Sequence, residues 1–288
     1  MICLVTGGLG FVGSNLADEL VKQGHDVHVW DNLSSDSSSE GYKNPQATYT
    51  IADIRSSHWK FFEHPQYDVI FHLAAHARIQ PSFEIPLDYL SNDIMGTAHV
   101  CELARKMGSR VVYAGSSTAF GGHMLNPYAF AKYTGEQVCE MYHRVFGLKI
   151  ATARFFNVYG PRQPKTGTWA TVIGVFENLS LQGKPMTVTG TGEQRRDFTH
   201  ISDIVSGLIA LSGIDGKGEI YSLGTGTNYT LNTVARMFSD NVVCIPARPG
   251  EAWETLADPS AANAATGWSA KVRLADYVNE WKKTHLSV

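Results

Sequence analysis

Residues 2–31 read ICLVTGGLGFVGSNLADELVKQGHDVHVWD, and this stretch decides the fold. A short apolar run, Ile2–Val5, ends in a glycine-rich turn that passes directly into a segment with helical spacing of its apolar residues. A second apolar run, Val27–Trp30, follows and ends on Asp31. This order predicts one β-α-β unit with three glycines at its first turn.

Each of the three glycines suits a bound dinucleotide. Gly7 allows a tight turn, Gly10 lets the backbone approach a pyrophosphate, and Gly13 lets the helix lie close to the sheet. The helix N-terminus adds free N–H groups and the positive end of its dipole. Asp31 follows Gly13 by 18 residues, where a carboxylate can bind ribose hydroxyls and repel a 2′-phosphate. The turn therefore predicts an NAD site and favours NAD over NADP.

The composition argues against several other classes of protein. The chain has 288 residues, 43% of them apolar, which is enough for one large or two small domains. A net charge of −3 without a basic run argues against a nucleic-acid partner. No apolar run approaches the ~20 residues of a membrane helix, so we expect no membrane contact.

The cysteines and the start of the chain suggest a compartment. Cys3, Cys101, Cys139 and Cys244 are far apart, which predicts buried thiols in a reducing compartment rather than disulfides or a zinc site. The first predicted strand begins at residue 2, which leaves no room for a signal peptide. We therefore expect a cytoplasmic protein.

Strands and helices alternate along the next part of the chain. The apolar patterns predict strands at Thr48–Ile51, Asp68–Leu73, Arg110–Ala114 and Lys149–Phe155, and helices at Leu87–Met107 and Pro127–Phe146. This alternation predicts a Rossmann-like α/β fold with a doubly wound parallel sheet. After about Gly160 the elements become shorter, with helices expected near Ala170–Gln182 and Asn232–Ser239. We predict an NAD-binding domain over residues 1–160, rejoined by segments near 197–224, and a smaller irregular α/β substrate domain over 161–288.

Candidate catalytic residues follow one of these strands. Tyr128 and Lys132 are four residues apart, so they share a face of the predicted helix. A lysine ammonium favours the phenolate and would lower the pKa of the tyrosine, which could then act as a general base. Ser116 ends a predicted strand beside the same crevice and could bind the hydroxyl that loses its proton. Together with nicotinamide, these residues predict removal of a proton and a hydride from an alcohol.

Motifs along nearly the whole chain resemble one family. They are TGGLGFVGSN, DNLSS, ADI, HLAA, the NDIMGT of Asn92–Thr97, NPYAFAK, RFFNVYGPR, GTGEQRRDFTHISD and PARPGE, in that order. The sequence resembles the extended short-chain dehydrogenase/reductases, specifically the nucleotide-sugar epimerase/dehydratase group, and within it the 4-epimerases of UDP-glucose and UDP-N-acetylglucosamine.

The resemblance implies sites for the cofactor and for the nucleotide sugar. The implied NAD-binding residues, with the glycines above, are Phe11, Val12, Asp31, Asn32, Asp53, Ile54, Leu73, Ala74, Ala75, Asn92, Tyr128, Lys132 and Phe155. The implied substrate-binding residues are Ser116, Asn157, Arg196, Arg248 and Thr255. Arginine suits the diphosphate because its planar fork matches phosphate oxygens. His72 and His76 lack an evident third ligand, so we expect structural roles for them and no metal. The six tryptophans are expected in the core.

The residues after Ser116 bear on which reaction follows. By the resemblance, dehydratases carry an Asp-Glu pair directly after this position and decarboxylases keep a Glu two residues beyond it. Here Ser117 and Thr118 occupy these places, which favours a 4-epimerase acting on a UDP-hexose or UDP-N-acetylhexosamine through a 4-keto sugar. A dehydratase or decarboxylase with an acid from elsewhere stays open as an alternative, as does a non-catalytic NAD-sensing protein.

Three further expectations rest on the resemblance. Thr255 occupies the position that gates access of N-acetyl groups, and its small side chain favours their entry. Only 12 residues separate Ser116 from Tyr128, where the family usually has a longer loop that helps to enclose the sugar. The helices over Leu87–Met107 and Pro127–Phe146 form the dimer interface in relatives, so we expect a homodimer.

Overall fold

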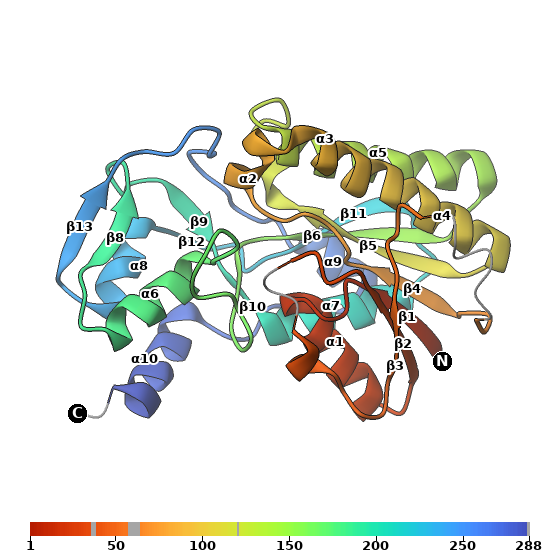
Figure 1. Cartoon of the computed structure of the whole chain (residues 1–288), viewed down its shortest axis with the longest axis horizontal. Coiled ribbons are helices and arrows are strands. Elements are labelled where there is room, and N and C mark those ends of the chain that lie inside the picture. The colour runs from red at the N-terminus through yellow and green to blue at the C-terminus, as the bar shows by residue number, and fades with distance from the viewer. Residues whose placement is uncertain (36–38, 57–63, 120, 287–288) are drawn as a thin grey trace.

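A seven-stranded parallel sheet forms the larger part of the molecule (Figure 1). The structure is a computed structural model and describes residues 1–35, 39–56, 64–119 and 121–286. The strands of the sheet are β1 (Ile2–Thr6), β2 (Asp26–Asp31), β3 (Thr48–Ile51), β4 (Val69–His72), β5 (Arg110–Ser116), β6 (Ile150–Phe155) and β11 (Lys217–Leu223). Their order is β11-β6-β5-β4-β1-β2-β3, which confirms the predicted doubly wound fold.

Helices cover both faces of this sheet, as Figure 1 shows. One face packs on α1 (Phe11–Lys22) and α7 (Ile201–Ser212), and the other on α4 (Gly96–Met107) and α5 (Pro127–Phe146). Successive strand residues point to opposite faces, so Val5 packs with α1 while Leu4 packs with α4. Two apolar cores result, one on each side of the sheet.

The predicted helix Leu87–Met107 is interrupted in the structure. It consists of α3 (Pro86–Tyr89), the π-helical segment η3 (Leu90–Met95) and α4. The wider turn leaves both Asn92 and Asp93 buried. Such π-turns are frequent at functional sites. Apolar spacing did not reveal this one, because a single wide turn hardly changes the helical period.

Helix α5 begins and ends as the sequence predicts. The Asn126 side chain accepts a hydrogen bond from the Ala129 N–H at 2.7 Å, and Pro127 occupies the first helical position. Gly147 ends the helix with a φ of 68°, a conformation that favours glycine. The Asn126 cap fixes the start of α5, and Tyr128 follows within its first turn.

The rest of the chain forms a smaller region of short elements around its own core. Its elements are β7 (Val158–Tyr159), α6 (Val172–Leu181), β8 (Met186–Thr189), β9 (Arg195–Asp197), β10 (Thr199–His200), β12 (Asn228–Thr230), α8 (Leu231–Phe238), β13 (Val242–Ile245) and α10 (Leu274–His285). Helices α6, α8 and α10 pack together in this core. Three two-stranded sheets, β10-β7, β12-β9 and β13-β8, complete the region.

The chain crosses between the two regions more than once. After residue 160 it returns to the large sheet through α7 and β11, and α9 (Ser260–Thr266) packs beside them. The division into domains at residue 160 stays a prediction. The crossings place chain segments from both regions around the space at the strand ends.

Candidate functional site

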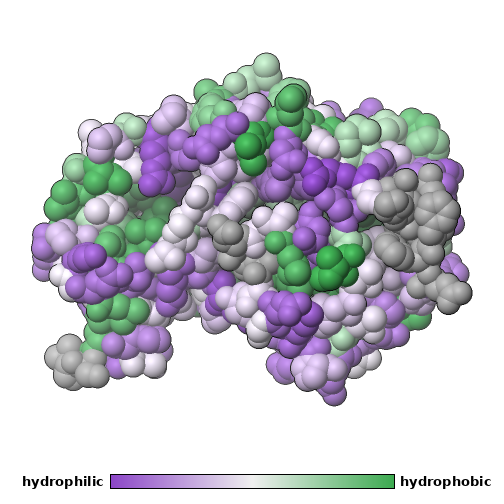
Figure 2. Space-filling view, viewed as in Figure 1, coloured by the Kyte–Doolittle hydropathy of each residue, from purple (hydrophilic) through white to green (hydrophobic). Residues whose placement is uncertain are grey.

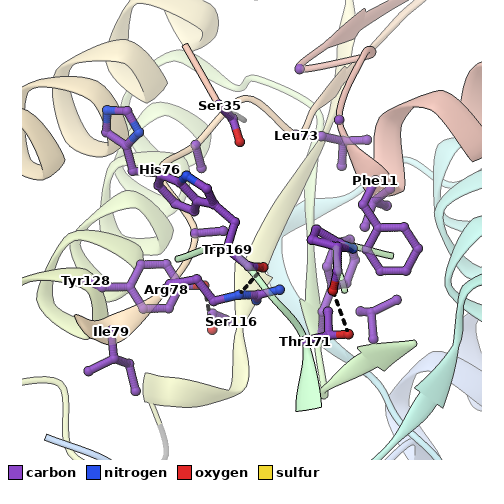
Figure 3. A pocket seen from close by; sticks show the side chains of 18 of the residues that line it. Phe11, Ser35, Leu73, His76, Arg78, Ile79, Ser116, Tyr128, Trp169 and Thr171 are labelled. Atoms are coloured by element: carbon purple, nitrogen blue, oxygen red, sulfur yellow. Dashed lines mark hydrogen bonds between the residues drawn. The ribbon is translucent and has the colours of Figure 1, made fainter. Parts of the chain in front are cut away.

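A cavity of about 690 Å³ lies at the carboxyl ends of the parallel strands. It opens beside β1 and β4, the neighbouring strands at which the order of the sheet reverses. Ligands of doubly wound sheets bind at such a reversal. The smaller region supplies the opposite wall through Asn157, Arg196, Thr255 and the segment around Trp169 (Figure 3).

The glycine turn shapes one end of the cavity. Gly7 has a φ of 70°, and a Cβ there would lie 2.7 Å from the Ala74 backbone nitrogen. A Cβ on Gly13 would lie 2.2 Å from the Gly7 carbonyl oxygen, so Gly13 lets the helix approach the turn itself rather than the sheet. A Cβ on Gly10 has room, with its nearest neighbour at 3.4 Å. A smooth, side-chain-free surface beside a helix N-terminus fits a pyrophosphate.

The carboxylate at the end of β2 is held by backbone N–H groups. Asp31 accepts hydrogen bonds from Leu9 N at 3.0 Å and Leu33 N at 2.8 Å, and its side chain is almost fully buried. These contacts fix the carboxylate at the cavity wall, where the sequence predicted a ribose contact. A fixed anion at this place fits the ribose of NAD and opposes a 2′-phosphate.

Asp53 lies behind this wall and does not line the cavity. Its carboxylate accepts hydrogen bonds from Arg55 and, at 3.1 Å, from Asn32 Nδ2. Mainly through the hydrogen bonds of the Arg55 side chain, the pKa of Asp53 falls to about 2. Asp53 can therefore position Asn32, which does line the cavity.

Most of the other predicted cofactor residues surround the same end. Those that line the cavity are Phe11, Val12, Ile54, Leu73, Ala74, Ala75, Asn92, Tyr128 and Phe155. Lys132, by contrast, is buried beneath this surface. Its ammonium lies 4.6 Å from the centre of the Tyr113 ring.

The predicted serine and tyrosine meet at the middle of the cavity. The Tyr128 hydroxyl donates a hydrogen bond to Ser116 Oγ at 3.2 Å (Figure 3). Thr118 Oγ1 donates to the same oxygen at 2.9 Å. The Thr118 backbone N–H also donates to it, at 3.3 Å. Because Ser116 Oγ is the acceptor in all three contacts, its own proton is available for a ligand.

The predicted effect of Lys132 on Tyr128 is wrong for this state of the protein. Burial raises the pKa of the Tyr128 phenol, while the hydrogen bond with Ser116 and the charge of Arg78 oppose that rise. Lys132 does not contribute to the shift. It interacts instead with the buried Asp93, whose charge opposes the lowering of the Lys132 pKa by burial. The cation that favours the phenolate here is an arginine that sequence reasoning missed.

Arg78 and Trp169 form a part of the site that the sequence did not indicate. Arg78 Nε donates a hydrogen bond to the Trp169 backbone oxygen at 3.0 Å. Figure 3 shows the Arg78 side chain beside the Tyr128 phenol, with the Trp169 side chain above both in this view. Arg78 follows the HLAA motif by three residues, which was the available signal. The expectation that all tryptophans belong to the core is wrong for Trp169, which lines the cavity, and for Trp253, which is 65% exposed, while Trp59 lies outside the described residues.

Both histidines near β4 are held by hydrogen bonds within the fold. His72 lies between Thr6 and Thr97, at 2.8 and 3.1 Å, and burial lowers its pKa to about 3. His76 Nε2 lies 2.6 Å from an Asp88 carboxylate oxygen. Within the part of the chain that the structure describes, no three His, Cys, Asp or Glu side chains are grouped to hold a metal ion.

The four cysteines are free, but only three of them are buried. Cys3, Cys101 and Cys139 lie in the core, whereas Cys244 is exposed on β13. The expectation of four buried thiols is therefore wrong for Cys244. This short strand pairs only with β8, so its outer side faces solvent.

The predicted substrate residues line the end of the cavity formed by the smaller region. Asn157 Nδ2 donates to the Asp197 carbonyl oxygen at 2.9 Å and lies 3.4 Å from Thr255 Oγ1. Arg196 is partly buried, with a carboxylate oxygen of Glu251 at 3.7 Å, while Arg248 is exposed at the rim. The two guanidinium groups give this end a positive character that suits a diphosphate.

The short connection between Ser116 and Tyr128 is covered by the smaller region. Asn126 Nδ2 donates to the Gly250 carbonyl oxygen at 2.9 Å. A Cβ on Gly121 would lie 2.2 Å from the Ala252 Cβ, so the two segments touch. Residues 250–252 therefore close the side of the cavity that a longer connection would otherwise close.

Fold and cavity together define a class of protein: a dinucleotide-binding α/β protein with a hydrogen-bonded serine and tyrosine at its centre. Comparisons with known proteins are more specific. Residues 3–224 match the model of the NAD dependent epimerase/dehydratase family. The chain therefore belongs to that family, which confirms both the resemblance and NAD as the cofactor.

Three relatives illustrate the range of the family. The chain is 34% identical to a UDP-N-acetyl-alpha-D-glucosaminuronate decarboxylase of Bacillus cytotoxicus, over 81% of this chain and 78% of that protein. It is 29% identical to a UDP-glucose 4-epimerase of Mycolicibacterium smegmatis, over 96% of both chains. The crystal structure of a UDP-glucose 4-epimerase of Thermotoga maritima with UDP-glucose superimposes with a TM-score of 0.92, at 29% identity over the full length of both chains.

The chain is thus an enzyme of an NAD-dependent family that contains epimerases and decarboxylases of nucleotide sugars. Among the helices of the described residues, none is long and apolar enough to cross a bilayer.

Proposed function

We propose that the protein is a 4-epimerase of a UDP-hexose or UDP-N-acetylhexosamine. The observation that carries this proposal is the hydrogen-bonded pair of Tyr128 and Ser116, followed by two hydroxyl residues rather than acids. The Thr118 hydroxyl donates a hydrogen bond to Ser116 Oγ, so the side chain at position 118 orients the serine and does not act as an acid. Elimination of water would need an additional acid close to this pair.

Each catalytic residue has one task in the proposed reaction. Ser116 donates a hydrogen bond to the oxygen on C4 of the sugar and so positions that oxygen. Tyr128 takes the proton of the 4-hydroxyl and later returns it. Lys132, whose charged form is favoured by Asp93 and opposed by burial, adds a positive field beneath the cofactor end. When bound, NAD supplies the site that accepts the hydride from C4 and gives it back.

The opposite end of the cavity holds the nucleotide while the sugar turns. Arg196 and Arg248 bind the diphosphate, because guanidinium groups form paired hydrogen bonds with phosphate oxygens. Asn157 and Thr255 form the adjoining wall, and the small Thr255 side chain leaves room for an N-acetyl group. A fixed diphosphate lets the 4-keto sugar present either face to the cofactor.

The alternative of a dehydratase or decarboxylase needs an acid in the cavity. Among the described residues that line the cavity, the acids are Asp31 and Glu251. Asp31 is held by the backbone, so Glu251 is the candidate for an acid from elsewhere. Its proximity to Arg196 favours a role in positioning that arginine instead.

Product analysis tests this proposal. The protein is incubated with UDP-glucose, UDP-galactose and their N-acetylated forms, and the products are separated and weighed by mass spectrometry. The proposal predicts conversion of at least one sugar into its 4-epimer without a change in mass. A loss of water with no 4-epimer would contradict it, as would loss of carbon dioxide from UDP-glucuronate, which is included because it carries the carboxylate that a decarboxylase removes.

We also propose a homodimer and a cytoplasmic location. Leu87 and Met95 on the α3–α4 segment and Val145 and Phe146 on α5 are large apolar residues that are exposed. Figure 2 shows green apolar side chains along the upper edge, over α3 and α5. Light scattering at several protein concentrations tests the dimer. The free thiols agree with a reducing compartment.

A further inference from the structure

Arg78 is a cation that lines the cavity and has no carboxylate partner in the part of the chain that the structure describes. Its Nε donates to the Trp169 backbone oxygen, and no ion pair with any described carboxylate accompanies this hydrogen bond. Other partly buried arginines of the described chain do form ion pairs. Arg154 pairs with the buried Glu136, and Arg55 pairs with Asp53 and Asp88.

Because Arg78 is partly buried, its unpaired charge destabilises the protein when no ligand is bound. Burial lowers the pKa of its guanidinium, which shows that the charged form is poorly solvated. A buried charge without a counter-charge destabilises a protein, unless a ligand supplies the counter-charge. A ligand with an anionic group would remove this cost on binding.

The backbone of Arg78 is strained as well. Its φ and ψ are 142° and 146°, a region that is used almost only by glycine. Three other described non-glycine residues have positive φ angles, Leu33, Asn157 and Arg162, but their values lie between 27° and 68°. Strain of this kind concentrates at ligand sites, where the surrounding structure holds a side chain in place. Here the Tyr89 hydroxyl donates to the Arg78 carbonyl oxygen at 2.9 Å and helps to hold it.

We propose that Arg78 binds a carboxylate on the sugar, so that the site favours a nucleotide hexuronate over a neutral hexose. This inference rests on the proposed function, which puts C4 of the sugar at Tyr128 and Ser116. Figure 3 shows the Arg78 side chain close to Tyr128 and Ser116, and the charge of Arg78 acts on the Tyr128 phenol. The ring carbon next to C4 that can carry an ionisable group is C5, whose substituent is a carboxylate in a hexuronate.

The diphosphate is a less suitable partner for Arg78. Arg196 and Arg248 already provide guanidinium groups at the end formed by the smaller region. Neither Nη atom of Arg78 has a hydrogen-bond partner among the residues that the structure describes, and a planar guanidinium matches a carboxylate with two parallel hydrogen bonds. UDP-glucuronate and UDP-glucose differ only at C6, so this pair of ligands isolates the proposed contact.

Binding measurements test the contact without turnover. Calorimetry with the NAD-loaded Tyr128→Phe protein compares the Kd values of UDP-glucuronate and UDP-glucose. We expect the glucuronate to bind about 10- to 100-fold more tightly, the range for a charge-assisted contact. Adding Arg78→Gln should reduce this ratio to near one, and Arg78→Lys should leave an intermediate ratio. Arg248→Gln is the matched control and should weaken both ligands equally.

The outcomes separate this inference from the proposed function. Equal affinities for the two ligands, or a ratio unchanged by Arg78→Gln, would overturn the carboxylate contact. Products of the unmodified enzyme are analysed in parallel. Formation of 4-epimers together with equal affinities would leave the proposed function standing alone. A preserved affinity ratio with a pentose product would support the contact and overturn 4-epimerisation. Thermal unfolding of each variant excludes misfolding as the cause of a lost ratio.

Discussion

The two ends of the cavity differ in how their charges are balanced. At the cofactor end, the Asp31 carboxylate accepts two backbone hydrogen bonds, and Asp53 is paired with Arg55. At the sugar end, Arg78 has a backbone carbonyl as its partner, and Tyr128 is held neutral by burial. The carboxylates of the cofactor end have partners within the fold, while the Arg78 charge at the sugar end has no carboxylate partner among the described residues.

This difference teaches where specificity resides. A preformed cofactor site binds the same dinucleotide whatever the sugar, because backbone groups and fixed carboxylates do not rearrange. A cation without a counter-charge discriminates between ligands through their charge. We therefore expect substitutions at the two ends to separate cofactor binding from sugar chemistry.

The largest effect should come from the sugar end. Tyr128→Phe removes the group that exchanges a proton with the sugar, so turnover should fall by about 10²- to 10⁴-fold. NAD should remain bound, because the glycine turn is untouched. Rates and bound nicotinamide are measured on the same preparation. Tyr133→Phe, one turn further on α5 and stacked on His123, is the control and should keep its activity. An active Tyr128→Phe enzyme would refute the proposed catalytic role.

The next effect concerns the cofactor end. Gly7→Ala places a methyl group 2.7 Å from the Ala74 backbone nitrogen, so the turn or β4 must move. Gly24→Ala has a similar positive φ but nothing within 4 Å, so it isolates the backbone term of about 1–2 kcal/mol. We expect Gly7→Ala to lose a further ~1–3 kcal/mol of unfolding free energy and most NAD affinity. Denaturation without NAD measures the loss of unfolding free energy, and the added stability with NAD measures the affinity for the cofactor. Equal losses in the two variants would show that the turn tolerates a side chain.

A third prediction uses pH to examine the charge balance around Tyr128. The phenolate is the form that accepts a proton, so kcat/KM should rise with pH through the pKa of Tyr128. The hydrogen bond with Ser116 lowers that pKa, so Ser116→Ala should move the rise to higher pH. Thr118→Val, which removes only the hydroxyl behind Ser116, should move it less. A shift to lower pH in Ser116→Ala would contradict this arrangement.

The smallest effect is expected at the paired carboxylate of the cofactor end. The pKa of Asp53 is about 2 in the folded protein, below its ordinary value of 3.8. The Asp53–Arg55 pair therefore adds to the free energy of unfolding above pH ~4, and this contribution is lost as the pH falls to about 2. Because both partners are partly exposed, we expect ~1 kcal/mol. Unfolding of the wild type and Asp53→Asn at pH 3 and pH 6 measures it, with the exposed Asp240→Asn as control. No difference in pH dependence between these variants would show that the Asp53–Arg55 pair adds no stability.

The sequence predicted the cofactor end better than the sugar end for a physical reason. Glycine spacing and the Asp31 carboxylate act through the backbone of one contiguous unit, so thirty residues contain the whole pattern. The strands and the caps of α5 follow equally local rules. The π-turn at Leu90–Met95 was missed because it depends on packing around buried Asn92 and Asp93.

The sugar end depends on contacts between distant parts of the chain. The Arg78–Trp169 hydrogen bond joins residues 91 positions apart, and the Asn126–Gly250 hydrogen bond joins residues 124 positions apart. Neither contact leaves a periodic signal. The wrong pKa prediction for Tyr128 has the same origin, since it counted Lys132 by helical spacing and ignored burial.

The backbone conformation of Arg78 has an evolutionary consequence. Selection for thermal stability alone would place glycine at position 78, because relief of such a conformation is worth about 1–3 kcal/mol. Glycine at position 78 would therefore give a more stable fold, whereas arginine gives stronger discrimination between substrates. Attempts to engineer heat resistance into the protein would trade away its choice of substrate there.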